Sequence, residues 1–305
     1  MPIMEKEFRL KIADNNDEYE GLRTLWCEVF SDEPAFVDAM YANFGEDIEG
    51  YIAVDEEGTV SSALTCFKCG LFEGRDVYTS YAICTSEDKR GLGLAGRLVE
   101  AARDDVLSRG GISLISPAEP SLENFYGAHG YVPLFYVDKR VAGEDEEDFI
   151  FDAEDNEYEK FEAKTVLKAL RWDEYNEYRE RFLEDVPHVK LNEHMMRLVQ
   201  AEAAMPNGES GLLLVNGGDA ICAMNAGEDG ALEIEELLVN PLLSSISSEI
   251  ADEMACRIAA HFERPHMKYR VPGGAYCQSM AAGLADEMMD KIQSGEPAYY
   301  GFPVE

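Results

Sequence analysis

The 305 residues include 61 acidic and 26 basic side chains, a formal net charge of −35 that both halves of the chain share. Such a charge repels nucleic acids and anionic membranes, so it argues against both as partners. It is compatible with a cationic small-molecule ligand or simply with a highly soluble surface. The length suits two domains, and the lack of a long apolar run or a leader pattern favours a cytoplasmic protein.

Seven cysteines, an odd number scattered through apolar segments, are typical of reduced thiols rather than of a disulfide framework. Cys66 and Cys69 form one C-F-K-C spacing without a second pair, so we expect one buried and one exposed thiol there and not a zinc site. The five histidines also lack a metal-binding spacing. The sequence therefore predicts no metal.

The first half reads as an alternation of strands and helices. In chain order we expect a strand at 7–12, helices at 17–30 and 35–44, strands at 48–54, 60–72 and 77–85, a helix at 94–109, a strand at 112–116, a helix from Ser121, and one or two strands at 131–141. Pro34 suits the first turn of the second helix. Leu94, Leu98 and Ala102 recur every four residues and share one face of the third helix.

The second half repeats this order of elements with different letters. We expect a strand at 164–170, helices at 172–182 and 191–203, strands at 211–215, 219–225 and 231–239, a helix at 247–262 and a strand at 266–271. Between the halves, residues 144–155 hold mainly carboxylates, whose mutual repulsion is typical of a solvated segment. The pattern predicts two domains of one fold, 1–145 and 161–305, joined by an acidic linker at 146–160.

The run R-G-L-G-L-A-G at 90–96 contains the dinucleotide fingerprint G-x-G-x-x-G. A dinucleotide fold would place this loop directly after an apolar strand, with an acidic residue at the end of the next strand. Here charged residues 86–90 precede the glycines, and the next strand ends in Ser116-Pro117. An oxidoreductase is therefore the least favoured of the alternatives.

The same letters also fit a loop for the pyrophosphate of an acyl-CoA. A glycine-rich turn that begins a helix directs backbone N–H groups at one point, where the helix dipole adds partial positive charge. Lys89, Arg90 and Arg97 place cations beside this turn in an otherwise acidic chain. This local reversal of charge favours an anionic ligand.

Two motifs in the right order carry a family resemblance. Y-A-I-C-T-S-E-D-K-R-G-L-G-L-A-G-R-L-V, followed about 30 residues later by E-N-F-Y-G-A-H-G-Y, resembles the signatures of the GNAT (Gcn5-related) N-acetyltransferases over residues 76–135. The family's R/Q-x-x-G-x-G/A falls on Arg90, Gly93 and Ala95, and its Phe-Tyr-x-x-x-Gly-aromatic on Phe125, Tyr126, Gly130 and Tyr131. The segment L-R-T-L-W-C-E-V-F-S-D-E-P-A-F resembles the two N-terminal helices of bacterial members.

The resemblance implies an α+β fold, with a mostly antiparallel twisted sheet flanked by helices, in two tandem GNAT-like domains. It implies an acetyl-CoA-dependent N-acyltransferase that acts on a primary amine of a small cationic acceptor or a peptide, with acetyl-CoA as co-substrate. The implied cofactor contacts are Ile83, Cys84, Thr85, Arg90, Gly91, Leu92, Gly93, Leu94, Ala95, Gly96 and Tyr126.

Tyr126 would also be the catalytic acid, because a phenol is protonated at neutral pH and can give its proton to the departing thiolate. Asp32 and Glu33 lie where the family places its acceptor groove, and they could bind an ammonium group or act only as helix caps.

Two departures from the family pattern bear on function. Glu119 stands where many members have Asn, and its charge would repel CoA phosphates. In the second half the corresponding loop, N-P-L-L-S-S-I-S-S at 240–248, has neither glycine nor arginine, so the resemblance implies a degenerate copy without cofactor. The main alternative is then a non-catalytic acyl-CoA-binding sensor or interaction module. A homodimer is compatible with either reading.

Overall fold

The computed structural model describes residues 8–142, 165–203, 205, 209–226, 232–244, 249–264, 266–284, 292 and 297–302. The first half contains β1 (Arg9–Ile12), α1 (Asn16–Phe30), α2 (Pro34–Phe44), β2 (Ile48–Val54), β3 (Val60–Phe72), β4 (Arg75–Thr85), α3 (Leu94–Ser108), β5 (Ile112–Ile115), α4 (Leu122–Ala128) and β6 (Val132–Ala142). These elements confirm the expected order. Asn15 caps α1 by accepting a hydrogen bond from the backbone of Glu18 (3.1 Å), and Pro34 occupies the first turn of α2.

The second half contains β7 (Leu167–Ala169), α6 (Trp172–Phe182), β8 (Lys190–Leu191), α7 (Glu193–Glu202), β9 (Leu212–Val215), β10 (Ala220–Ala226), β11 (Leu232–Val239), α8 (Pro241–Ser244), α9 (Ile250–His261), β12 (Met267–Pro272) and β13 (Tyr276–Ala282). The order expected from the sequence is again confirmed, with β8, α8 and β13 as additions. None of the helices in the described part of the chain is long and apolar enough to cross a bilayer.

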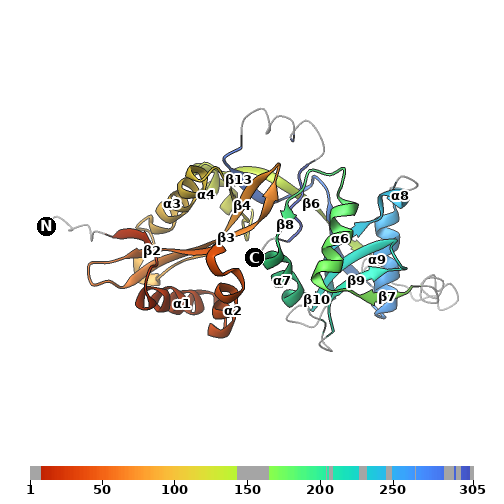
Figure 1. Cartoon of the computed structure of the whole chain (residues 1–305), viewed down its shortest axis with the longest axis horizontal. Helices are drawn as coiled ribbons and strands as arrows, with labels where there is room; N and C mark the ends of the chain where they lie inside the picture. Colours follow the sequence, from red (N-terminus) through yellow and green to blue (C-terminus); the bar gives the residue numbers. More distant parts are fainter. Residues whose placement is uncertain are drawn as a thin grey trace.

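All described strands belong to one sheet, in the order β1-β2-β3-β4-β5-β13-β6-β12-β11-β10-β9-β7, with β8 paired to β3. Among the pairs of described strands, β4–β5 and β11–β12 alone are parallel. The structure therefore confirms the α+β class with a mostly antiparallel sheet. In Figure 1, helices α1 to α4 lie on the left and helices α6 and α9 on the right.

The two halves exchange strands at the centre of this sheet. β13, from the end of the chain, lies between β5 and β6, where Met280 pairs with Ile115 and Tyr276 pairs with Val137. β6 in turn pairs along β12. The division into domains 1–145 and 161–305 stays a prediction, but the sheet runs through both ranges. The expected linker at 146–160 lies outside the described residues.

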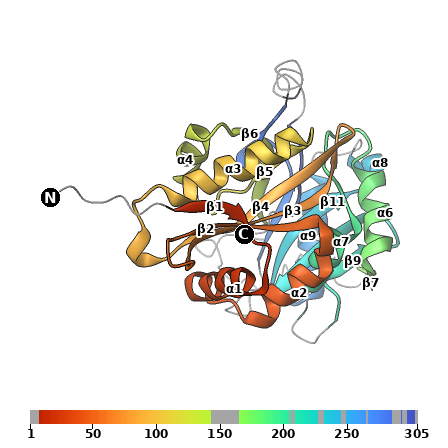
Figure 2. The same cartoon turned by 60° about the vertical axis from the view of Figure 1, so that its left-hand side comes forward.

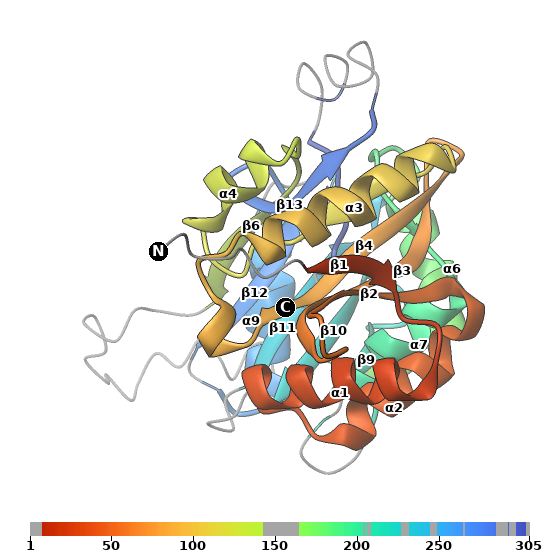
Figure 3. The same cartoon turned by 90° about the vertical axis from the view of Figure 1, so that its left-hand side faces the viewer.

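Helices cover both faces of the sheet. Around the strands of the first half, α1 and α2 lie on one face and α3 and α4 on the other (Figures 2 and 3). The residues expected on the inner face of α3, among them Leu98 and Val106, are fully buried. On the opposite face one continuous core extends from α1 and α2 to α6 and α7, so the halves share buried apolar surface.

Burial on both faces corrects one expectation. Cys66 and Cys69 are both buried, at 1% and 0% exposure, so the prediction of an exposed thiol is wrong. Side chains three residues apart on a strand point to opposite faces. Cys66 packs into the α3 side of the sheet and Cys69 into the α1 side, and helices cover each.

Arg75 fastens β13 to the first half. Its guanidinium donates to the carbonyl oxygens of Gly110 (2.9 Å) and Gly111 (2.6 Å) in the turn after α3, and of Gly283 (2.6 Å) directly after β13. A planar guanidinium can satisfy three carbonyls at once in a way that an ammonium group cannot. This contact joins residues 208 positions apart in the sequence.

Candidate active site

The strands β4 and β5 separate at the point where the resemblance implies the thioester. Their parallel pairing ends at Ser80 and Ile115, and no described strand pairs with β4 on that side beyond Ser80. On the β3 side, Thr65 pairs with Tyr81 but Ala63 pairs with Cys84, so β4 carries one extra residue. This bulge has Ala82 in the left-handed region at φ 49° and turns the end of β4 away from β5.

The segment expected to bind pantetheine, Ile83 to Thr85, follows this bulge. Ser62 fixes it from β3, because its hydroxyl donates to the carbonyl oxygen of Cys84 (2.7 Å) and lies 2.8 Å from the hydroxyl oxygen of Thr85. The Cys84 side chain is buried, so only its backbone is available to a ligand. The structure thus presents an extended, anchored backbone edge at the opening between β4 and β5.

The glycine loop leads from this edge into α3. Gly91 (φ 80°) and Gly93 (φ 72°) are left-handed, and a Cβ on either would meet no atom within 4 Å. Their surroundings are therefore open, and glycine is required by the backbone conformation. Gly93 is the N-cap residue of α3 and offers no side-chain cap, so the first-turn N–H groups, including that of Ala95, are left to a ligand or solvent.

The cations around this loop differ in availability. Lys89 is paired with Asp88, whereas Arg90 is exposed and its Nε donates to the carbonyl oxygen of Thr85 at 3.3 Å. Arg97 is exposed on the first turn of α3 and makes no side-chain hydrogen bond or ion pair with any described residue. Arg90 and Arg97 are therefore the cations best placed to meet an anion at the loop.

The remaining loop positions divide into one exposed and two packed residues. Leu92 is 55% exposed, and Leu94 is buried in the core beneath α3. Gly96 is needed for close packing, because a Cβ there would lie 2.6 Å from Cε1 and Nε2 of His129. This contact brings the end of α4 against the start of α3, and α4 carries the candidate acid.

Tyr126 lies on α4 and is 7% exposed, in the core on the α3 face. Its ring meets Phe125 (5.2 Å) and Tyr131 (6.4 Å) edge-on. Burial raises the pKa of Tyr126, which keeps the phenol protonated at neutral pH. The hydroxyl has no hydrogen-bond partner among the described residues, so it can act as a donor to a ligand.

The two acidic candidates between α1 and α2 have different surroundings. Asp32 is half-buried and accepts a hydrogen bond from the indole of Trp26 at 2.7 Å. The Trp26 ring meets Tyr81 edge-on at 5.3 Å, which places Asp32 near the residue before the β4 bulge. Glu33 is exposed at the N-terminus of α2 and forms no capping hydrogen bond. Neither carboxylate therefore serves as a helix cap.

Two further residues that the sequence analysis did not single out, Tyr81 and Glu202, belong to this region. Burial raises the pKa of Tyr81, and the charges of Asp32 and Glu202 raise it further, so both carboxylates act on this hydroxyl. Glu202 is the last residue of α7 and comes from the other half of the chain. No local pattern distinguishes it among 61 acidic residues, because only the tertiary fold brings it to β4.

Both departures from the family pattern lie at the surface. Glu119 is exposed and holds the hydroxyl of Ser121. In the second half, Pro241–Ser244 forms the short helix α8 and Leu242 is 76% exposed. The expected loss of a pyrophosphate cradle there stays a prediction, since residues 245–248 lie outside the described residues.

Solved structures with the same fold come from several organisms. A probable N-acyltransferase from Enterococcus faecalis V583 has a TM-score of 0.61 at 13% identity, and the matched region covers 90% of this chain and 72% of the Enterococcus chain. A GCN5-related N-acetyltransferase from Kribbella flavida has a TM-score of 0.60 at 12% identity, with 90% and 71% covered. Another, from Anabaena variabilis ATCC 29413, has a TM-score of 0.59 at 13% identity, with 86% and 66% covered.

No family model and no curated sequence matches this chain. At 12–13% identity the likeness concerns the fold, and since it covers 86–90% of the chain it includes parts of both halves. Together with the β4 bulge and the glycine loop, it shows that the chain has the fold of the GCN5-related N-acetyltransferases.

Proposed function

We propose that the protein is an N-acyltransferase that uses acetyl-CoA to acetylate a primary amine of a small cationic acceptor. The observation that carries this proposal is the coincidence of two features at one place. The backbone edge of β4 opens away from β5 at the Ala82 bulge, and the uncapped, glycine-rich N-terminus of α3 follows directly. The edge of β4 would hold the amide-bearing pantetheine arm of acetyl-CoA, and the N-terminus of α3 would bind its pyrophosphate.

The residues present fit acetyl-CoA. Gly91 and Gly93 leave the loop backbone open, and Arg90 and Arg97 add positive charge where the N–H groups of α3 converge. When bound there, acetyl-CoA supplies an activated acetyl group and a thiol leaving group. The backbone after the bulge would orient the thioester, since amide N–H groups stabilise a developing oxyanion.

Tyr126 would then supply the proton that the leaving sulfur takes up. Its raised pKa keeps this proton in place until a thiolate forms nearby. Asp32, held by the Trp26 indole, would contribute negative charge on the acceptor side of β4. That charge favours a cationic amine over an anionic acceptor.

Calorimetric titration with acetyl-CoA tests the cofactor part of this proposal. We expect saturable binding that Gly93→Glu abolishes, because the carboxylate occupies the loop that would receive the pyrophosphate. Gly74→Glu is the matched control, since Gly74 is also left-handed (φ 75°) with no atom near its Cβ but lies in the β3–β4 turn. Equal binding by both variants would remove the loop from the cofactor site.

Release of free CoA thiol across a panel of amines tests the catalytic part. Turnover with at least one primary amine supports an acyltransferase. Binding of acetyl-CoA without thiol release for any amine would favour the alternative, a non-catalytic acyl-CoA-binding module.

A further inference from the structure

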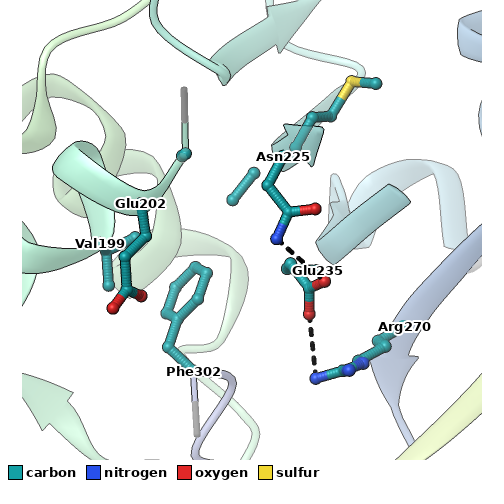
Figure 4. A pocket seen from close by; sticks show the side chains of 9 residues that line it. Val199, Glu202, Asn225, Glu235, Arg270 and Phe302 are labelled. Carbon is teal, nitrogen blue, oxygen red and sulfur yellow. Dashed lines mark hydrogen bonds and ion pairs between the residues drawn. The ribbon is translucent and has the colours of Figure 1, made fainter. Parts of the chain in front are cut away.

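A cavity of about 230 Å³ lies between α7 and the strands β10 to β12. Figure 4 shows Glu202 on one side and Asn225 and Glu235 on the other, with Phe302 between them. Glu235 is engaged on its own side, because it pairs with Arg270 (2.9 Å) and accepts from the amide of Asn225 (3.2 Å). Arg270 balances the charge of Glu235, and Glu202 adds a further carboxylate to the lining of the cavity.

The backbone of Glu202 is fixed by the packing of α7, whereas its carboxylate has no partner among the described residues. It ends α7, which packs against α2 and β3 of the first half. The side-chain amide of Asn43 on α2 donates to the carbonyl oxygen of His194 on α7 at 2.8 Å and fastens the two helices. The Glu202 carboxylate makes no hydrogen bond or ion pair with any described residue, so it is available to a ligand.

The charge of the same carboxylate also acts on the first half. It raises the pKa of Tyr81, the residue that precedes the bulge at Ala82. The described residues that line the cavity all come from the second half, and Glu202 connects this lining to β4 through its charge.

We propose that this cavity receives the acceptor amine, and that Glu202 binds its ammonium group and takes the proton that must leave before the nitrogen can attack. This inference rests on the proposed function. A volume of about 230 Å³ suits a small aliphatic amine rather than a peptide segment, since pockets for drug-sized ligands are about 300 Å³ or larger. The Phe302 ring offers an apolar surface to the methylene groups of such an amine.

The protons and bonds balance as follows. Glu202 accepts one proton from the ammonium group, and the neutral nitrogen forms a C–N bond with the thioester carbon as the C–S bond breaks. Tyr126 gives its proton to the sulfur and regains one, through solvent, from the nitrogen of the new amide. Glu202 releases its proton to water in the cavity, so one proton is liberated for each amide formed.

The titratable and charged groups around Glu202 come from four parts of the chain: β4, β11, β12 and the C-terminal segment. Burial and the charge of Glu235 on β11 raise the pKa of Glu202 to about 7, while Arg270 on β12 is engaged with Glu235. Tyr81 on β4 and Tyr300 in the C-terminal segment are neutral phenols whose pKa values lie above the usual range. Glu202 is an exposed residue at the end of α7, and a carboxylate whose pKa is raised is a stronger base than an ordinary one.

The test compares wild type with Glu202→Gln and Glu193→Gln. Glu193 is the matched control, because it lies at the other end of α7 and, within the part of the chain that the structure describes, forms an ion pair with Arg197 alone, at the surface. In calorimetry without acetyl-CoA at pH 8, we expect wild type and Glu193→Gln to bind 1,4-diaminobutane equally. Glu202→Gln should bind the same amine at least 10-fold more weakly.

Kinetics add a second readout with the amine that gives turnover. We expect kcat/KM of wild type to rise through pH 7 and then level, and Glu202→Gln to lack this inflection and to be about 100-fold slower at pH 7.5. Glu202→Asp should recover part of the rate. Binding or pH profiles of Glu202→Gln that match wild type, or no amine binding by wild type, would overturn the inference.

The experiments distinguish a failure of the proposed acceptor site from a failure of the proposed function. Loss of amine binding in Glu202→Gln with unchanged acetyl-CoA affinity supports the acceptor site. If wild type does not bind acetyl-CoA but binds the amine through Glu202, the proposed function is wrong and the amine site stands. If acetyl-CoA binds and turnover occurs equally in all three proteins, the proposed function stands and Glu202 has no part in it.

Discussion

The imidazole of His129 occupies the space into which a side chain on Gly96 would project, 2.6 Å from the ideal Cβ position. His129 ends α4 and is held by Glu100 of α3 at 3.0 Å, so its ring cannot turn away without losing that contact. The contact between Gly96 and His129 sets how closely the helix of the candidate acid approaches the helix of the glycine loop.

Gly96→Ala is expected to destabilise the protein by about 1–3 kcal/mol, the usual cost of overpacking. Gly127→Ala on α4 is the control, because a Cβ there would meet nothing within 4 Å. It should stabilise the fold by about 0.4–1 kcal/mol through the unfolded chain. Urea unfolding of both variants measures the two free energies, and changes of the same sign would refute the packing argument.

Tyr126→Phe is expected to lower kcat by about 100-fold while the affinity for acetyl-CoA stays the same, because the hydroxyl acts on the leaving group. Its stability should change by less than about 0.5 kcal/mol, since the hydroxyl has no described partner.

Tyr131→Phe provides the opposite pattern. The Tyr131 hydroxyl lies 2.7 Å from the hydroxyl of Ser113, and both are buried. Losing it should cost about 1 kcal/mol of unfolding free energy and leave kcat unchanged. Steady-state kinetics and urea unfolding of both variants measure these effects. Full turnover by Tyr126→Phe would contradict the assignment of Tyr126 as the acid.

The order of helices and strands could be predicted from the sequence because it depends on local patterns. The spacing of Leu94, Leu98 and Ala102 fixes the inner face of α3, and the turn residues mark the ends of β2 and β3 at the observed positions. The glycine loop could also be placed, since its spacing is visible in the sequence and glycine permits the left-handed backbone that Gly93 adopts.

The position of β13 could not be predicted in this way. Nothing local to Tyr276–Ala282 indicates that the strand pairs with β5 and β6, more than 130 residues earlier in the chain. The same limit applies to Glu202. Its approach to Tyr81 depends on how α7 packs against α2, and a periodic pattern reports only which face of α7 is buried.

Arg75→Ala is expected to loosen β13 more than any other strand, because it removes all three hydrogen bonds to Gly110, Gly111 and Gly283. The unfolding free energy should fall by about 2–3 kcal/mol, given about 1 kcal/mol for each bond. Amide hydrogen exchange in residues 276–282 should accelerate. Arg171→Ala is the control, since Arg171 is exposed and its only ion pair among the described residues is with Asp173. Equal exchange in both variants would show that Arg75 does not hold the strand.

Glu202→Gln is expected to stabilise the protein at alkaline pH and to leave its stability unchanged at acidic pH. The pKa of Glu202 is raised to about 7, first by burial and then by Glu235. A raised pKa means that the folded state disfavours the charged form. Below pH about 4.5 both the folded and the unfolded chain hold this proton, so Glu202 does not lower the free energy of unfolding. Between pH about 4.5 and 7 the unfolded chain gives up the Glu202 proton while the folded chain keeps it, so the stability of wild type falls over this range and levels above pH 7. Glutamine has no such proton, and the variant does not lose this stability. Melting temperatures of both proteins from pH 4.5 to 8.5 should therefore diverge between pH 5 and 7. Parallel curves would show that the surroundings of Glu202 do not perturb its ionisation, and they would remove the physical basis for its role as a base near neutral pH.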